Sequence, residues 1–394
     1  MKLVFISNAL TPHQMPLCDE WYTMENIIFT FIEAANIDKS KLPIGWRTTS
    51  TRDYVVDYNL YQSKYEYYQQ IIDDADVVIL GSVSINNVKH RLRKGRITFI
   101  YSERIYKNTK QLLKLPMHIM KFNRLYNSYK SLYLLCASAF SAYDYKRIGC
   151  FKNKAYKWGY FTSVDSKEPL SLKSLESKSN ALSLMWCSRF LDWKHPELPI
   201  KMAAVLKHKG YKFHLDMYGS GMKLESIKLL INNLNVSDVI SLKGEMPNHE
   251  IIDAMRKHDI FLFTSDKYEG WGAVANEAMA NGCVLVASSK IGSVPFLVEH
   301  RKNGCIFESE NLDSLVEQVE WLIENPSIKQ KLALSAYQTL HDVWSPQNAA
   351  ISLINLVKAL NQGKESPFQL GPCSEAPILT NDWYFKFSQQ QITK

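Results

Sequence analysis

Short apolar runs that alternate with helical stretches limit most strongly how this chain can fold. A first series of such runs covers residues 3–7, 27–32, 77–80, 97–101, 132–137 and 156–161, with helical stretches at 109–128 and 140–148. Continuous apolar runs of this length are typical of strands buried on both faces, and their alternation with helices predicts a parallel sheet.

A second series of the same kind follows a polar, Ser- and Lys-rich stretch that has no periodicity. Strands are expected at residues 182–188, 213–218, 239–242, 260–264 and 284–287, and helices at 197–209, 224–234, 250–257 and 274–281. Two further helical stretches are expected at residues 312–343 and 348–360. This half has the more regular α/β period, which again indicates a doubly wound domain.

The fold class predicted from both series is α/β, with two Rossmann-like, doubly wound domains that face a central cleft. The expected boundaries are residues 1–165, a linker at 166–180, a second domain at 181–344, and a segment at 345–394 whose helix crosses back to the first domain. A chain of 394 residues is long enough for two such domains. Ligands of this architecture bind at the carboxyl ends of the strands.

The cysteines and the apolar runs indicate a cytoplasmic protein. The seven cysteines are scattered singly, without a CxxC pair, and are typical of reduced thiols. No run of 18 apolar residues occurs, and the apolar N-terminal run ends at Asn8, too soon for a signal peptide.

Positive charge is concentrated in one part of the chain, whose net charge is +8. Residues 89–157 contain 17 Lys and Arg but only two acidic residues, Glu103 and Asp144. One interpretation is a solvated basic face, and the other is attraction to an anionic membrane surface or another polyanion. Aromatic residues lie between these cations, but the chain has no nucleic-acid recognition motif, so we expect no nucleic-acid partner.

The segment at residues 269–277, Glu-Gly-Trp-Gly-Ala-Val-Ala-Asn-Glu, joins a predicted strand to a predicted helix. Glycines at such a junction let backbone amides approach an anion such as a diphosphate. Glu269 and Glu277 would repel phosphate and suit the recognition of sugar and ribose hydroxyls instead. The alternative is a loop carboxylate and a helix-capping carboxylate. The predicted donor-binding residues in this segment are Gly270, Trp271, Gly272, Ala273 and Glu277.

Two loops after earlier strands supply further candidates. Arg189 and Lys194 precede a helix that begins at a proline, and together they can neutralise a departing diphosphate without a metal ion. Two solvated basic residues are the alternative. Gly219 and Ser220 follow the next strand, where a tight backbone can line the same pocket.

Taken in order, these residues resemble the retaining glycosyltransferases of family 4. The resemblance covers residues 182–324 and rests on Arg189, Lys194, the Gly219 loop and the pair Glu269 and Glu277. It implies the two-domain GT-B fold, with a nucleotide-sugar donor held by the second domain. It also implies retention of configuration, with Glu269 as the catalytic residue beside the donor sugar, Glu277 on the ribose, and Arg189 and Lys194 on the diphosphate.

The first domain departs from that pattern. The paired-glycine loop found in many members after the first strand is replaced by residues 8–14, from which His13 and Gln14 are candidates for contact with acceptor or donor. An ordinary loop histidine is the alternative for His13. The region expected to carry a histidine holds Glu103 instead, so Glu103 is a third candidate.

The opening residues and the stretch at 134–161 resemble bacterial polysaccharide-assembly members of the family. The hypothesis is therefore transfer from a UDP-sugar, or alternatively a GDP-sugar, to a glycan or polyprenyl-linked acceptor. We expect no metal or other cofactor. We also expect the protein to associate peripherally with the inner face of the cell membrane. A sugar-nucleotide epimerase of similar fold and, less favoured, a basic nucleic-acid-binding protein are the alternatives.

Overall fold

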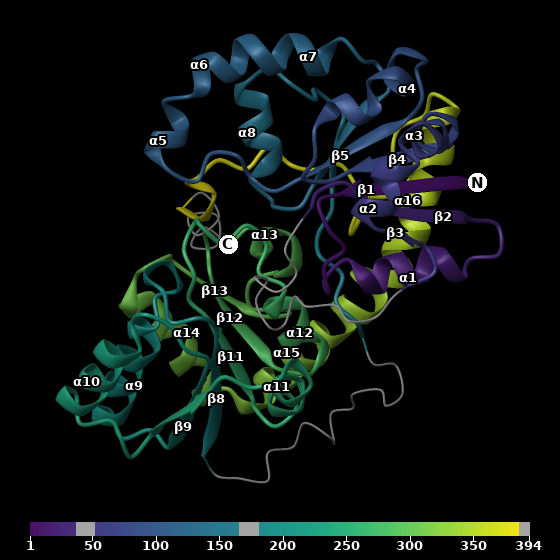
Figure 1. Ribbon diagram of the computed structural model, residues 1–394. Coiled ribbons are helices and arrows are strands. Elements are labelled where there is room, and N and C mark those ends of the chain that lie inside the picture. The colour runs from purple at the N-terminus through teal and green to yellow at the C-terminus, as the bar shows by residue number, and fades with distance from the viewer. Residues whose placement is uncertain (37–51, 165–180, 386–394) are drawn as a thin grey trace. The chain divides into compact units, whose positions relative to one another are not determined.

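The computed structural model describes residues 1–36, 52–164 and 181–385 (Figure 1). The chain divides into two compact units. The first consists of residues 1–163 and 343–380, and the second of residues 164–342 and the segment from 381 onward. The linker expected at residues 166–180 lies outside the described residues.

The first unit is built on a seven-stranded, all-parallel sheet with the strand order β3-β2-β1-β4-β5-β6-β7. Its strands are β1 (Lys2–Ser7), β2 (Ile28–Glu33), β3 (Val55–Val56), β4 (Val77–Leu80), β5 (Thr98–Ser102), β6 (Leu132–Cys136) and β7 (Ala155–Lys157). The central strand β4 is buried along its whole length, as its apolar sequence predicts. The strand expected at residues 156–161 is shorter and ends at Lys157.

The helices of the first unit lie between these strands and at the end of the chain. They are α1 (Met15–Thr23), α2 (Tyr58–Ser63), α3 (Tyr65–Asp74), α4 (Lys89–Arg93), α5 (Thr109–Leu112), α6 (Leu115–His118), α7 (Arg124–Asn127), α8 (Ser141–Arg147) and α16 (Pro346–Asn361). Helix α16 packs against α1, where the indole Nε1 of Trp21 donates to the carbonyl of Ala350 at 3.3 Å. The C-terminal helix is therefore part of the first unit.

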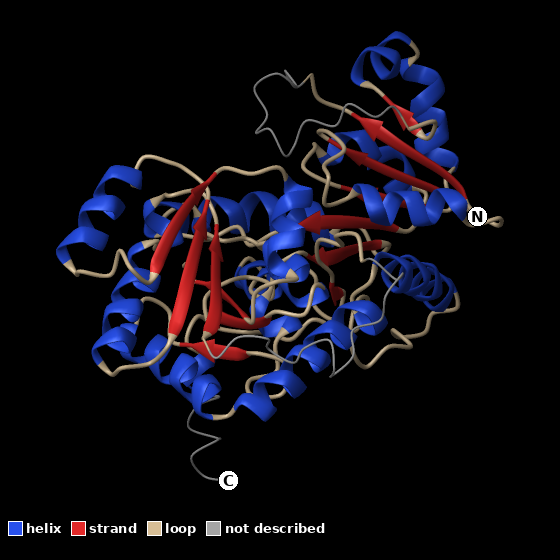
Figure 2. Cartoon of the chain, turned by 90° about the horizontal axis from the view of Figure 1, so that it is seen from below, coloured by secondary structure: helices blue, strands red, loops and turns tan. Residues whose placement is uncertain are grey.

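The second unit contains a six-stranded parallel sheet with the order β10-β9-β8-β11-β12-β13 (Figure 2). Its strands are β8 (Leu182–Cys187), β9 (Phe213–Tyr218), β10 (Ile240–Gly244), β11 (Ile260–Phe263), β12 (Val284–Ser288) and β13 (Cys305–Phe307). Its helices are α9 (Glu197–His208), α10 (Leu224–Asn233), α11 (Asn248–Met255), α12 (Val274–Ala280), α13 (Val294–Leu297), α14 (Leu312–Glu324) and α15 (Pro326–Gln338).

Two of the helices expected from the sequence are wrong in their extent. The stretch at residues 312–343 is two helices, because Pro326 cannot continue α14 and begins α15 instead. The stretch at 109–128 is broken before α6, whose second residue is Pro116, and contains a π-helical turn at Ile119–Asn123.

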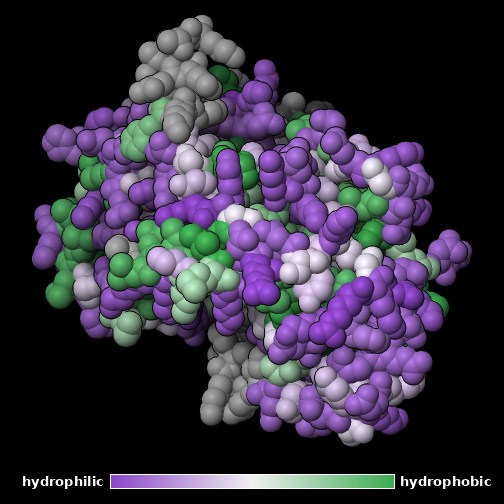
Figure 3. All heavy atoms as spheres, turned by 90° about the horizontal axis from the view of Figure 1, so that it is seen from above, coloured by the Kyte–Doolittle hydropathy of each residue, from purple (hydrophilic) through white to green (hydrophobic). Residues whose placement is uncertain are grey.

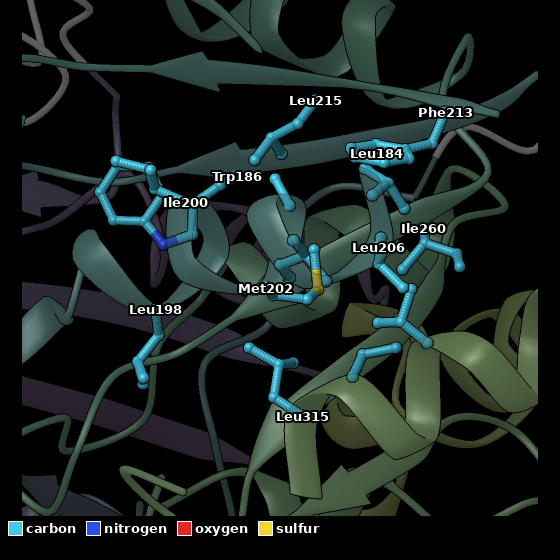
Figure 4. Close-up of a cluster of buried hydrophobic side chains, with 14 of the residues drawn as sticks. Leu184, Trp186, Leu198, Ile200, Met202, Leu206, Phe213, Leu215, Ile260 and Leu315 are labelled. Carbon is cyan, nitrogen blue, oxygen red and sulfur yellow. The ribbon is translucent and has the colours of Figure 1, made fainter. Parts of the chain in front are cut away.

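A large apolar core holds the second unit together. Leu184 and Trp186 of β8 are covered by Ile200, Met202 and Leu206 of α9 (Figure 4), and all five side chains are buried. Burying a side chain of this size stabilises a fold by about 1.5–3 kcal/mol. The strands β8 and β11, from which the two loops extend, are therefore held firmly in place by this core.

Both sheets reverse their strand order once, between β1 and β4 in the first unit and between β8 and β11 in the second. Such a reversal leaves a crevice at the carboxyl ends of the two strands, where ligands bind. All seven cysteines are free thiols. Among the helices of the described residues, none has the length and apolarity to cross a membrane.

Candidate functional site

The loops after β8 and β11 meet at a buried ion pair between Lys194 and Glu269. The Nζ of Lys194 donates to Oε2 of Glu269, and each residue exposes only 9 % of its surface. The ammonium group also lies 4.1 Å from the ring centroid of Trp193. Because the two charges compensate each other, both can stay buried at the end of the sheet.

Backbone and side-chain hydrogen bonds fix the loop that carries Lys194. The hydroxyl of Thr264, at the end of β11, donates to the carbonyl of Lys194 at 2.7 Å and accepts from the indole of Trp186 at 2.9 Å. The amide of Asp266 donates to the carbonyl of Trp193 at 3.0 Å. The sequence brings Arg189 and Lys194 into one loop, and these bonds join that loop to the one that ends in Glu269.

His195 adds a positive charge beside the pair. Its backbone is left-handed, with φ of 49°, and its ring nitrogens lie 3.0 Å from Glu197 and 3.4 Å from Asp266. Burial lowers its pKa, but hydrogen bonds to Asp266 and Glu197 outweigh burial and raise the pKa to about 9. His195 is therefore an imidazolium at neutral pH.

His195, Asp266 and Glu310 also form a group with metal-ligand atoms within 4.8 Å of one another. Within this group, Asp266 is ion-paired with His195, and Glu310 is exposed.

The glycine segment between β11 and α12 has one position that only glycine suits. Gly272 has φ of +82°, and a Cβ there would lie 2.2 Å from the ring of Phe263. The side chain of Trp271 is fully buried, with its indole donating to Asn276 at 2.9 Å. Because its ring is buried, Trp271 can contribute to the predicted donor site only through its backbone. Gly270 and Ala273 are buried on either side.

Glu277 lies in the first turn of α12 and is partly exposed. Its Oε1 accepts from the side-chain amide of Asn248 at 3.1 Å. Burial raises the pKa of Glu277 to about 7. Burial and then the nearby Glu277 carboxylate raise the pKa of Cys187, at the end of β8, to about 12. Glu277 thus lies close to the same switch point as Lys194.

The loop after β9 closes against the loop after β8. Gly219 has φ of +119°, and a Cβ there would lie 2.0 Å from the carbonyl oxygen of Ser188. The amide of Phe190 donates to the carbonyl of Ser220 at 2.7 Å, and the Ser220 hydroxyl donates to Glu245. Arg189, between these contacts, is exposed.

The predicted donor residues therefore lie after three strands of one sheet, β8, β9 and β11. Lys194 and Glu269 form a buried ion pair, Arg189 is exposed in the same loop as Lys194, and the Glu277 carboxylate can accept two hydroxyls. This arrangement can bind a diphosphate through Arg189 and Lys194 and hydroxyl groups through Glu269 and Glu277.

The first unit has its own cavity of about 860 Å³, at the β1/β4 switch point. Its walls come from the ends of β1, β4 and β5 and from the helical segment after β5. They are mainly neutral polar and aromatic groups, with Glu103, Lys121, Phe122, Tyr126 and Tyr160 among them.

His13, Gln14 and Glu103 all line this cavity. The ring of His13 stacks on Tyr160 at 5.7 Å, and the Tyr160 hydroxyl donates to Glu103 at 2.7 Å. Burial lowers the pKa of His13, so its ring is neutral at physiological pH. Gln14 turns back on its own loop and accepts from the amide and hydroxyl of Thr11 at 3.2 and 3.1 Å.

Several residues of the two sites were not singled out from the sequence. His195 and Asp266 lie in the loops after β8 and β11. Because they are 71 residues apart in the sequence, their contact could not be predicted. Asn248 and Tyr160 meet Glu277 and Glu103 from distant elements. The one sequence feature that could have pointed to these residues is the recurrence of polar residues just after successive strands.

Comparison with known proteins agrees with this geometry. Residues 169–339 match the family described as glycosyl transferases group 1. An uncharacterized glycosyltransferase of Haemophilus influenzae is 25 % identical over 44 % of this chain and 48 % of its own length. The poly(glycerol-phosphate) alpha-glucosyltransferase of Bacillus subtilis is 25 % identical over 50 % of this chain and 30 % of its own. The chain thus spans about half or less of these relatives.

HepE of Anabaena, solved in complex with UDP, is similar in fold. It has a TM-score of 0.63 at 16 % identity and covers 90 % of this chain and 99 % of its own. The prediction of the GT-B class, with two Rossmann-like doubly wound domains, is confirmed. The match to the glycosyl transferases group 1 family is confined to residues 169–339, which hold the site around Lys194 and Glu269.

Proposed function

We propose that this protein is a retaining glycosyltransferase of bacterial cell-surface polysaccharide synthesis. It transfers a sugar from a nucleotide-sugar, preferably a UDP-sugar with a GDP-sugar as the alternative, to a glycan or lipid-linked glycan. The observation that carries the proposal is the buried pair of Lys194 and Glu269 at the β8/β11 switch point, within the family-matched segment.

On the donor side, each residue has a separate task. Lys194 and Arg189 bind the diphosphate, and Lys194 also forms an ion pair with the Glu269 carboxylate. Glu269 accepts hydrogen bonds from hydroxyls of the donor sugar, and Glu277 accepts from the ribose. The backbone at Gly219–Ser220 and Gly270–Ala273 lines the donor pocket, where the glycines have no side chain to fill the space.

The proposed reaction breaks the bond between the anomeric carbon and the diphosphate oxygen. The acceptor hydroxyl attacks that carbon from the face that the diphosphate leaves, and the diphosphate takes the hydroxyl proton. The configuration is therefore retained, and the charge that develops on the leaving group is stabilised by Lys194 and Arg189. We propose that no metal ion is required, and unchanged rates in excess EDTA are the expected result.

The cavity of the first unit is the proposed acceptor site. Its neutral polar walls and its aromatic residues Phe122, Tyr126 and Tyr160 suit a sugar, which offers hydroxyls and an apolar ring face. His13 and Glu103 are the groups placed to orient an acceptor hydroxyl. Relatives named for glycosylating poly(glycerol-phosphate) support a surface-glycan acceptor.

We also propose that the basic region between residues 89 and 157 attracts the protein to the anionic inner face of the cell membrane. A lipid-linked acceptor would be found there.

A thermal-shift screen with UDP-, GDP-, ADP- and dTDP-sugars tests the donor assignment. We expect one nucleotide class to raise the melting temperature. At a hundredfold excess over Kd, its binding should increase the unfolding free energy by about 2.7 kcal/mol. No shift with any donor would overturn the proposal. The selected donor is then incubated alone, where an epimerase would isomerise it and a transferase would only hydrolyse it slowly.

A further inference from the structure

The helical segment after β5, residues 109–127, is held to the first unit by one face only. His118 Nδ1 pairs with the hydroxyl of Tyr106 at 2.8 Å. The amides of Asn123 and Asn127 donate to the carbonyls of Ile148 and Gly149 at 3.0 and 2.8 Å. These contacts fix the inner face and turn the remaining side chains outward.

The outer face of this segment exposes large apolar side chains to solvent. Leu113, Met117 and Met120 are 77 %, 54 % and 80 % exposed, and the neighbouring Ile119 is 41 % exposed. Leu113 lies in the turn between α5 and α6, Met117 lies in α6, and Met120 lies in the π-helical turn that follows, so the three form an apolar stripe along one short segment. Several large apolar groups gathered in so short a segment mark an interaction surface.

Cations surround this stripe. Lys110, Lys114, Lys121 and Arg124 are exposed, and no Asp or Glu occurs between residues 104 and 143. Figure 3, which views the molecule from the side of α6 and α7, shows hydrophobic atoms gathered beside hydrophilic ones on this face. Lysine is depleted from protein–protein interfaces, whereas apolar residues flanked by Lys and Arg are typical of segments that lie in a membrane interface.

We propose that this outer face, formed by Leu113, Met117 and Met120 with Lys110, Lys114 and Lys121, inserts into the headgroup region of an anionic lipid bilayer. The apolar side chains enter the acyl boundary, and the cations bind anionic headgroups.

The inner face of the same segment explains why membrane docking would be useful. This part of the inference rests on the proposed transferase function. Phe122, Leu125 and Tyr126 line the cavity of the first unit, and the exposed Lys121 lies at its rim, where the inner and outer faces meet. An acceptor whose lipid anchor stays in the bilayer would thus meet its site beside the surface that docks. The wider basic region explains attraction to the membrane, and this segment explains where contact is made.

Flotation of the full chain with vesicles tests the proposal. Vesicles of phosphatidylcholine with phosphatidylglycerol are compared with pure phosphatidylcholine at low salt. The variant Leu113→Gln/Met117→Gln/Met120→Gln is compared with a control that loses three equally exposed apolar groups elsewhere, Ile28→Gln/Leu229→Gln/Leu370→Gln, which are 65 %, 63 % and 73 % exposed. Circular dichroism and the nucleotide-induced thermal shift verify that each variant is folded.

We expect wild type and control to float with the anionic vesicles, and the outer-face variant to partition about tenfold less strongly. Lys110→Gln/Lys114→Gln/Lys121→Gln should lose the preference for anionic lipid. Wild type that stays with the soluble fraction, or an outer-face variant that floats equally well, would overturn the proposal. So would a vesicle-free dimer that the outer-face variant abolishes, because the surface would then bind a second copy.

The experiment separates this inference from the proposed function. Flotation without any nucleotide-induced shift would leave the docking intact and remove the transferase assignment. A nucleotide-induced shift without flotation would do the reverse.

Discussion

The two units carry the same doubly wound sheet, but they build their sites differently. In the second unit, the charged groups come from loops after neighbouring strands and hold one another, as Lys194 holds Glu269 and His195 holds Asp266. In the first unit, the cavity is lined mainly by neutral polar and aromatic groups from many elements, with a few charged side chains such as Glu103 and Lys121. A diphosphate needs fixed charges, and a sugar needs shaped polar walls, so the difference points to a donor side and an acceptor side.

The largest effect is expected from removing the charge of Glu269. Glu269→Gln keeps the size of the side chain but weakens its hydrogen bonds to the donor sugar and leaves Lys194 without its anion. Transfer should fall by at least about a hundredfold, or about 2.7 kcal/mol, in assays of labelled product. A loss below about tenfold, ~1.4 kcal/mol of barrier, would contradict its role.

Removing the partner cation should act on nucleotide affinity. Lys194→Met takes away a phosphate ligand, so the Kd for the nucleoside diphosphate should rise about tenfold in calorimetric titration. It also leaves a buried carboxylate unpaired, at a cost of about 3 kcal/mol in unfolding free energy. The exposed Lys302→Met is the control in the same unit. Unchanged affinity for Lys194→Met would remove the diphosphate assignment.

A change in the first unit should leave the donor untouched. Glu103→Gln weakens the carboxylate that Tyr160 and Lys107 contact, so the KM for acceptor should rise roughly fivefold, about 1 kcal/mol, at constant donor KM. Glu66→Gln, an exposed carboxylate on α3 of the same unit, is the control. If donor KM rose with acceptor KM, the two sites could not be assigned to separate units.

A pH-dependent gain in stability is expected from removing the Glu277 carboxylate. Folding raises the pKa of Glu277 from 4.5 to about 7, so the folded state binds that proton more tightly than the unfolded state. Its contribution to stability is therefore present at low pH and is lost as pH rises through 7. Glu277→Gln should exceed wild type by about 1–2 kcal/mol in denaturant unfolding at pH 8 and match it at pH 5. Equal stability at both pH values would contradict a buried, costly carboxylate.

How much of this could be predicted from sequence differs between the same two regions. Arg189, Lys194, Glu269 and Glu277 follow strands whose apolar runs are clear, so their meeting at one sheet edge was predictable. The glycine segment was also identified, but the burial of Trp271 was not, because a ring next to glycines can turn to either side. The pairing of Lys194 with Glu269 requires knowledge of which loops touch.

The first unit was less predictable because its site has no local motif. His13, Gln14 and Glu103 were identified from their places after strands, yet Tyr160 and Lys121 enter the cavity from elements far along the chain. The outer face at Leu113–Met120 was also hidden, because the sequence pattern suggested one continuous helix from 109 to 128. The breaks around Pro116 and the single attached face become visible only in three dimensions.

Hydrogen exchange with and without UDP tests the central claim, that the second unit alone holds the donor, most directly. The account predicts slower exchange in residues 188–195, 218–221 and 266–277, with the amides of the loop at 8–14 unchanged or slowed less. Slower exchange confined to the first-unit cavity, or none in the loops around Lys194 and Glu269, would contradict it.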